Sequence, residues 1–274
     1  MSLSVGTATE RAKSLLSKDH LMTILLERGI TEQMAIAAGL RSASSRDAKA
    51  ILGFDPGSGG ILILYTHPQT GTTRTFRFRP DNPLLVSGKP AKYLTPRGVG
   101  NLIYFPPGTG ERLKGCADPL VITEGELKAL AAVQHGLLCV GLTGVWGWKT
   151  RADGPSQSIA DLDLIDVHSR AVTIVFDSDV CLNGQVKRAR QALAKEFYRR
   201  GASTVYAVDL PAPDGSKVGL DDYLKSKGLD GYLGLDVCEL PPTDIPRFLE
   251  PISTLLSTPE EPLECGKRPR TRNL

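Results

Sequence analysis

The sequence predicts an α/β fold: a mostly parallel sheet with helices on both faces, preceded by a smaller, basic α+β subdomain. Short apolar, β-branched runs recur from about residue 117 onward, and continuous runs of this kind are typical of strands buried on both faces. Segments with helical periodicity separate these runs, which favours parallel pairing. The strands are expected at 120–123, 138–142, 172–176 and 204–208, the helices at 126–135 and 185–200, and a short last helix near residue 220.

The first hundred residues predict a different pattern. Apolar residues at helical spacing predict a helix within residues 10–40 that ends at Gly29, and Thr31 is expected to cap a second, short helix through Ala37. The other expected elements are a loop at 41–58, a hairpin of strands at 61–65 and 72–79, an extended basic loop at 87–96 and a strand at 102–105.

These elements divide the chain into three expected parts. Residues 1–116 form the helical and α+β basic subdomain, and residues 117–238 form the strand–helix domain. Residues 239–274 are rich in proline and end in basic residues, so a partly disordered tail is expected.

Composition excludes several classes of protein. Of the 274 residues, 41% are hydrophobic and 23% are charged, which is ordinary for a soluble globular protein. No apolar stretch reaches membrane-spanning length and the N-terminus lacks a secretory pattern, so a cytoplasmic protein without a membrane partner is expected. The five cysteines and four histidines are scattered without a C-x2-C spacing, which argues against zinc.

The charge distribution indicates a polyanionic partner. The net charge of +3 says little, but residues 74–97 hold six basic residues against Asp81 alone, and residues 267–274 hold four basic residues and no acid. Such zones suit contact with nucleic acid, although a solvated surface explains either zone nearly as well.

Acidic residues follow two of the expected strands directly. Glu124-Gly125-Glu126 comes after the first strand, and Asp177-Ser178-Asp179 comes after the strand at 172–176. Taken singly, each motif could cap or begin the following helix. Together they place several carboxylates at one edge of the sheet, where they would repel one another unless a divalent cation shares them. In extended backbone, Asp177 and Asp179 would point to the same side.

The combination of these two acidic motifs, each after a strand, resembles the TOPRIM domain of bacterial primases, topoisomerases and related nucleases. TOPRIM proteins carry a Glu after the first strand, here Glu124, and a D-x-D after a later one, here Asp177 and Asp179. The segments 218–224 and 90–94 (Pro-Ala-Lys-Tyr-Leu) are similar to segments of the primase core, so the resemblance spans roughly residues 15–230. The sequences at 124–129 and 141–146 look closest to primase-like replication proteins of phages, plasmids and other mobile elements.

The resemblance implies a Mg²⁺-dependent nucleotidyltransferase, with Mn²⁺ as an alternative ion. It would make short primers on single-stranded DNA from nucleoside triphosphates, during replication of a mobile element or a chromosome, with a separate replicative helicase as a candidate partner. The implied catalytic residues are Glu124, Asp177 and Asp179, the implied metal ligands are these three with Asp222 and Glu126, and the implied nucleotide- or nucleic-acid-binding residues are Arg77, Arg79, Lys89, Lys92, Tyr93 and Lys128.

Alternatives stay open at this stage. A TOPRIM nuclease or strand-processing enzyme would use the same carboxylates, and a non-catalytic nucleic-acid-binding module could recruit a helicase or polymerase. Asp222 is as well explained by helix capping as by metal binding. Trp146 and Trp148 could stack on bases, but core or lid packing is the more common use of such residues.

Overall fold

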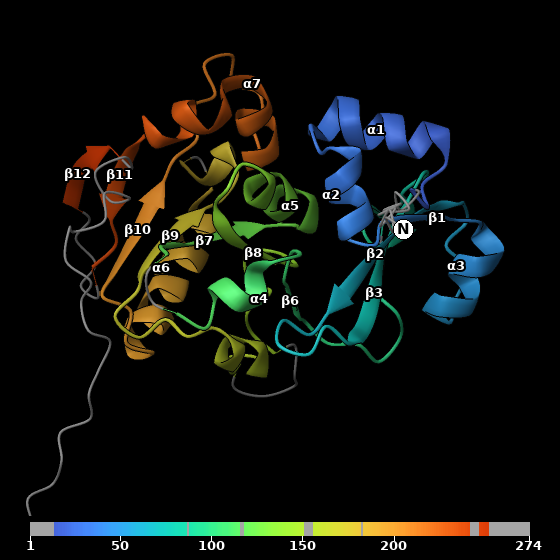
Figure 1. The fold of residues 1–274 in the computed structure, drawn as a ribbon, viewed down its shortest axis with the longest axis horizontal. Coiled ribbons are helices and arrows are strands. Elements are labelled where there is room, and N and C mark those ends of the chain that lie inside the picture. The colour runs from blue at the N-terminus through green and yellow to red at the C-terminus, as the bar shows by residue number, and fades with distance from the viewer. Residues whose placement is uncertain are drawn as a thin grey trace, which may run out of the picture. The chain divides into compact units, whose positions relative to one another are not determined.

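The computed structural model describes residues 14–86, 88–115, 118–150, 156–181, 183–241 and 247–251 (Figure 1). The chain forms two compact units. Unit 1 extends through Val99 except for residues 67–71, and unit 2 comprises residues 67–71 and everything from Gly100 onward. The contacts thus divide at residues 99 and 100, whereas the sequence placed a domain boundary at residues 116 and 117; the functional extents of the predicted domains stay a prediction.

Unit 1 begins with the two predicted helices. α1 (Lys18–Arg28) ends at Gly29, whose φ of 63° is left-handed, a conformation that glycine adopts without strain. The Thr31 side chain accepts a hydrogen bond from the Met34 amide and caps α2 (Glu32–Ala37). Both helix ends are therefore confirmed.

The predicted loop at 41–58 is wrong over residues 41–52. This segment contains β1 (Arg41–Ala43) and α3 (Ser45–Leu52). The Ser44 hydroxyl accepts a hydrogen bond from the Asp47 amide and caps α3, and Ala48 and Leu52 are buried beneath it. Serine and aspartate favour helix caps as well as loops, so composition alone could not distinguish the two.

A three-stranded antiparallel sheet completes unit 1. β2 (Gly60–Thr66) pairs with β1 on one side and β3 (Thr73–Pro80) on the other, which confirms the predicted hairpin. The short strands β4 (Leu84–Val86) and β5 (Lys89–Ala91) form a separate ladder within the predicted basic loop. The core beneath the sheet contains Ala48, Leu52, Leu62, Phe78 and Leu94.

Unit 2 is built on a seven-stranded sheet of order β12-β11-β10-β9-β7-β8-β6. The four central strands are parallel, and β6, β11 and β12 add antiparallel edges. The strands are β6 (Ile103–Tyr104), β7 (Leu120–Glu124), β8 (Leu138–Leu142), β9 (Ala171–Val175), β10 (Thr204–Val208), β11 (Asp236–Glu239) and β12 (Arg247–Pro251). The helices are α4 (Thr109–Arg112), α5 (Glu126–Gln134), η1 (Ala160–Leu164), η2 (Ser178–Cys181), α6 (Gly184–Arg199) and α7 (Leu220–Leu233).

The predicted short last helix, α7, is longer than expected, and the backbone at Gly228 inside it is non-helical. The predicted disordered tail, residues 239–274, instead contains the last residue of β11 and all of β12, at the sheet edge. Most of that tail, residues 242–246 and 252–274, lies outside the described residues.

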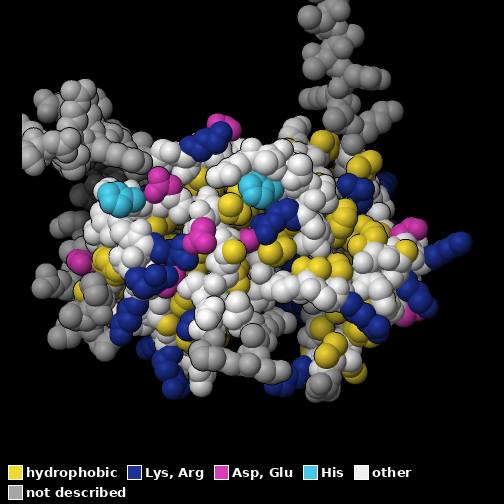
Figure 2. Space-filling view, turned by 90° about the horizontal axis from the view of Figure 1, so that it is seen from below, with side chains coloured by type: hydrophobic (Ala, Val, Ile, Leu, Met, Phe, Trp, Pro, Cys, Tyr) yellow, Lys and Arg dark blue, Asp and Glu magenta, His cyan; other side chains and the backbone are white. Residues whose placement is uncertain are grey.

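Lys and Arg side chains are spread over the face drawn in Figure 2, with Asp and Glu side chains among them.

Among the helices of the described residues, none combines the length and the apolar character that crossing a membrane requires.

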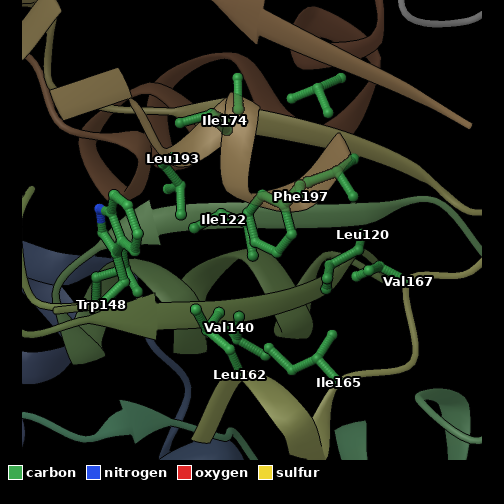
Figure 3. Packing of buried hydrophobic residues seen from close by; sticks show 14 of the residues in the cluster. Leu120, Ile122, Val140, Trp148, Leu162, Ile165, Val167, Ile174, Leu193 and Phe197 are labelled. Carbon is green, nitrogen blue, oxygen red and sulfur yellow. The ribbon is translucent and has the colours of Figure 1, made fainter. Parts of the chain in front are cut away.

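Helices cover both faces of the sheet in unit 2, as predicted. The crossovers β7-α5-β8 and β9-α6-β10 run toward opposite ends of the strand order, so right-handed connections place their helices on opposite faces. On one face, Leu193 and Phe197 of α6 pack against Ile122 and Ile174, and residues of η1 and its vicinity continue the same core (Figure 3). α5 and α7 pack together on the other face.

A charged link holds α6 to the η1 segment. The Glu196 carboxylate accepts hydrogen bonds from Arg199 at 2.6 and 2.9 Å and from Arg200 at 2.7 Å. Arg200 also donates to Asp163 of η1 at 2.6 Å. Burial alone would raise the pKa of Glu196, but these hydrogen bonds lower it to about 2.

Candidate active site at the carboxyl edge of the parallel strands

The predicted acidic residues meet at one edge of the unit 2 sheet. β7 and β9 are parallel neighbours, with Thr123 opposite Val175. Glu124 is the last residue of β7, and Asp177 follows the end of β9 by two residues. Gly125 then turns the chain into α5 with a φ of 102°. Parallel pairing therefore brings the two motifs to the same edge, as the sequence predicted.

Two lysines hold the aspartates. The Lys128 ammonium, in the first turn of α5, lies 2.5 Å from Oδ1 of Asp177. The Lys217 ammonium lies 3.1 Å from Oδ2 of Asp177 and 2.9 Å from Oδ2 of Asp179. One cationic nitrogen is thus shared by both aspartates.

Backbone pairing brings Lys217 to this position. The Ser178 amide donates to the Val218 carbonyl at 3.0 Å, and the Val218 amide donates to the Ser178 hydroxyl at 2.9 Å. The segment before α7 is thereby fixed against the D-x-D motif. The extended backbone expected for that motif is wrong, because Asp179 lies in the 3₁₀ turn η2, yet both aspartates still reach the same ammonium.

The electrostatics of Glu124 also connect it to this cluster. Burial is the largest influence and raises the pKa of Glu124. The charges of Lys128 and Lys217 oppose this effect, and the charges of Asp177 and Asp179 add to it. For Lys217, burial would lower the pKa, but the hydrogen bonds to Asp179 and Asp177 outweigh it and raise the pKa. Three acids and two lysines thus form one coupled group, which we call the acid–lysine cluster.

The acid–lysine cluster is not arranged as a ready metal cage. Among the described residues, no three His, Cys, Asp or Glu side chains are grouped so that they could hold a metal ion. The chemistry of the donors nevertheless fits a divalent ion, because Mg²⁺ prefers carboxylate oxygens. Asp177 and Asp179 already share one cation, the Lys217 ammonium. A metal ion bound to the Oδ2 atoms of both carboxylates would compete with the Lys217 ammonium.

Two other predicted metal ligands lie differently. Glu126 is fully buried, and its charge helps burial to raise the pKa of Tyr104 in β6. Asp222 is exposed and accepts a hydrogen bond from the Gly219 amide at 3.0 Å, which is the capping role. The predicted metal roles of Glu126 and Asp222 stay untested, and burial in one case and capping in the other count against them.

Side chains crowd the position of Gly219. A Cβ atom at this position would lie 2.6 Å from Oδ1 of Asp221 and 2.7 Å from Cε of Lys128, so a larger residue here would require these two side chains to move. Asp221 itself is buried. The start of α7 and the Lys128 stem are therefore packed directly against each other.

The predicted basic residues lie in unit 1, apart from Lys128. Arg77 and Arg79 face the same side of the hairpin as Ile63 and Ile61, their cross-strand partners, and both arginines are half-buried. This face of the hairpin is therefore only partly open to solvent.

The contacts of these basic residues are local. The Arg77 guanidinium lies over the Tyr93 ring at 5.0 Å, and Arg79 lies 3.9 Å from Glu27. Lys89 and Lys92 are exposed. Contact of this zone with nucleic acid stays a prediction.

Two features of the site were not predicted from the sequence: Lys217 and a cavity beside Glu124. Lys217 had one local signal, its position three residues before α7. The cavity measures about 580 Å³, and its lining includes Glu124, Asn101, Thr143, Trp146 and Lys149. These residues come from separated segments, so no sequence spacing could have grouped them.

Comparisons with known proteins agree with this fold. Residues 114–230 match the model of a family described as a domain of unknown function, DUF3854. No curated protein matches the chain.

Three solved primase structures are similar to the chain. The RNA polymerase domain of Mycobacterium tuberculosis primase DnaG has a TM-score of 0.55 at 16% identity, covering 78% of this chain and 75% of that one. The zinc-binding and RNA polymerase domains of Aquifex aeolicus primase have a TM-score of 0.53 at 18% identity, covering 78% of this chain. A DnaG primase catalytic domain bound to ssDNA has a TM-score of 0.50 at 16% identity, covering 77% of this chain and 68% of that one.

At these identities the similarity concerns the fold. The chain spans about half, 54%, of the Aquifex aeolicus primase structure. The resemblance found in the sequence and the arrangement of unit 2 agree with it: this chain has the fold of the catalytic core of bacterial DnaG primases.

Proposed function

We propose that this protein is a primase-like nucleotidyltransferase that uses divalent metal ions to synthesise short primers on single-stranded DNA from nucleoside triphosphates. The observation that carries the proposal is the shared cation of Asp177 and Asp179 beside Glu124, in a fold of the primase-core type. Single-stranded DNA as template is supported by the similar DnaG domain that was solved bound to ssDNA.

In this proposal, Asp177 and Asp179 hold Mg²⁺ or Mn²⁺, and Glu124 completes the site or accepts the proton of the attacking hydroxyl. The bound ion would neutralise the triphosphate and lower the pKa of the 3′-hydroxyl. A carboxyl group suited to accept a proton near neutral pH has a raised pKa, and burial shifts Glu124 in that direction.

The lysines have separate roles in this proposal. Lys128 is mostly buried, with 18% of its side chain exposed, and holds the Asp177 carboxylate in place. Lys217 is 56% exposed, so it can leave the aspartates at low cost and bind the phosphates of the nucleotide. The Arg77, Arg79, Lys89 and Lys92 side chains of unit 1 would contact triphosphate or template backbone.

Replication of a mobile element or a chromosome is the process in which such primers are used, and a separate helicase is the candidate partner. The process and the helicase partner both follow from the proposed primase role.

A labelled-DNA assay tests the proposal and its nuclease rival together. Single-stranded DNA is incubated with Mg²⁺ or Mn²⁺, with and without nucleotides, and products are separated by length. We expect new short chains that depend on nucleotides, and their loss in an Asp177→Asn/Asp179→Asn double variant. An Asp230→Asn variant, at an exposed acid of α7, is the matched control. Shortening of the DNA without nucleotides would favour the nuclease, and synthesis by the double variant would refute the site.

A further inference from the structure

The cavity beside Glu124 has the size of a nucleotide site. Its volume of about 580 Å³ falls within the range of small-molecule sites, about 300–1,000 Å³. A duplex would not fit into it. Its wall includes Glu124 of the acid–lysine cluster, so any occupant lies next to the proposed reaction centre.

One wall of the cavity offers an aromatic surface. Trp146 lines the cavity and keeps 39% of its surface exposed, whereas Trp148 is buried with 3% exposed. The two rings stack at 6.2 Å between centroids with an interplanar angle of 26°. Trp148 is thereby anchored in the core and supports Trp146 from below (Figure 3 shows Trp148 at the end of that core). Core packing explains Trp148, but it does not explain the exposed part of Trp146.

The same wall carries a cation and polar groups. The Lys149 ammonium lies 4.9 Å from the Trp146 ring centre and 4.6 Å from that of Trp148. Asn101 donates to the Lys149 carbonyl at 2.7 Å, and the Thr143 hydroxyl lies 3.4 Å from the Asn101 side-chain oxygen. These contacts fix the loop after β8 that presents Trp146.

We propose that this cavity binds a single nucleobase of a mononucleotide substrate, which stacks on Trp146 while its phosphates are attracted by Lys149. The inference rests on the proposed function and names the place where its nucleotide is held. Stacking suits a site that accepts different bases, because every base presents a π-face to an aromatic ring. A cation near the ring adds attraction for the phosphates that a base alone would lack.

Intrinsic fluorescence provides the first test, because the chain contains only two tryptophans, Trp146 in the cavity lining and Trp148 stacked against it. The full chain is titrated in EDTA with ATP, adenosine and inorganic tripolyphosphate. We expect saturable quenching by ATP, weaker but saturable quenching by adenosine, and none by tripolyphosphate. Quenching by tripolyphosphate as strong as that by ATP would show a phosphate site without base recognition and would overturn the inference.

Calorimetry on variants provides the second test. Loss of a stacked base costs about 5- to 150-fold in affinity by typical stacking energies, so Trp146→Leu is expected to bind ATP at least about 5-fold more weakly, and Trp146→Phe to retain most of the affinity. Lys114→Ala, at an exposed residue of another cavity, serves as the control. Equal ATP affinity of Trp146→Leu and the unmodified protein would overturn the inference.

The two proposals can fail separately. If Asp177→Asn/Asp179→Asn abolishes primer synthesis but nucleotide binding does not depend on Trp146, the base site is refuted and the proposed function stands. If nucleotide binding depends on Trp146 but the protein makes no primers under any condition, the base site stands and the proposed function is refuted.

Discussion

In the proposed site, Lys217 and a divalent ion would compete for the carboxylate oxygens of Asp177 and Asp179, and this competition can be measured. Lys217→Ala removes an ammonium that lies 3.1 Å from Asp177 and 2.9 Å from Asp179. Because Lys217 is 56% exposed, each contact is screened by water and contributes about 0.2–1 kcal/mol. Two contacts therefore amount to about 0.4–2 kcal/mol, which corresponds to an increase of roughly 2- to 30-fold in divalent-ion affinity.

Mn²⁺ titration followed by electron paramagnetic resonance measures this affinity directly. We expect Lys217→Ala to bind Mn²⁺ more tightly than the unmodified protein, and Lys187→Ala, at an exposed lysine of α6, to bind it equally. Primer synthesis by Lys217→Ala is expected to fall, because the phosphates of the nucleotide lose a cation. Unchanged or weaker Mn²⁺ binding by Lys217→Ala would refute the competition.

Three further changes test other parts of the structure. Glu196→Gln removes a carboxylate whose pKa is about 2. The lowered pKa stabilises the fold above about pH 4.5 and this stabilisation is lost toward pH 2, so the variant should be less stable by about 1–2 kcal/mol at pH 7 after screening. Its stability should also depend less on pH in denaturation between pH 2 and 7, whereas parallel pH curves would contradict the ion-pair account. Gly125→Ala places a side chain at a φ of 102°, with no other atom within 4 Å of its Cβ. Urea denaturation should therefore show a loss of stability of about 1–3 kcal/mol from backbone strain alone, and the control Gly184→Ala should not show it. Equal stability of the two variants would argue against strain. Lys128→Met leaves Asp177, only 7% exposed, without its closer partner, although Lys217 remains. The loss of stability should be about 1–3 kcal/mol, and most of it should be recovered in thermal melts at saturating Mn²⁺. An equal Mn²⁺ effect on the variant and the unmodified protein would exclude this compensation.

The sheet and its acidic edge could be predicted from the sequence because both depend on local patterns. Buried parallel strands appear as apolar, β-branched runs, and the residues directly after them must lie at one edge. Glu124 and Asp177 were found in this way. The helix ends at Gly29 and Thr31 were found for a similar reason, since caps depend on single residue types.

The remaining parts of the site depend on tertiary contacts that leave little trace in the sequence. Lys217 reaches the aspartates only because the backbone at Val218 pairs with Ser178. Glu126 is buried beside Tyr104 because β6 joins the sheet next to β8. Asp179 lies in a 3₁₀ turn that begins at Ser178, the residue that pairs with Val218. The extended conformation expected from the spacing of the two aspartates is therefore not formed.

Mn²⁺ binding to the acid–lysine cluster tests the central claim most directly. The unmodified protein, the Asp177→Asn/Asp179→Asn double variant and the Asp230→Asn control are titrated with Mn²⁺ under identical conditions and followed by electron paramagnetic resonance. We predict saturable binding by the unmodified protein and the control, and its loss in the double variant. Equal binding by all three proteins, or none by any of them, would contradict the assignment of these aspartates to a metal site.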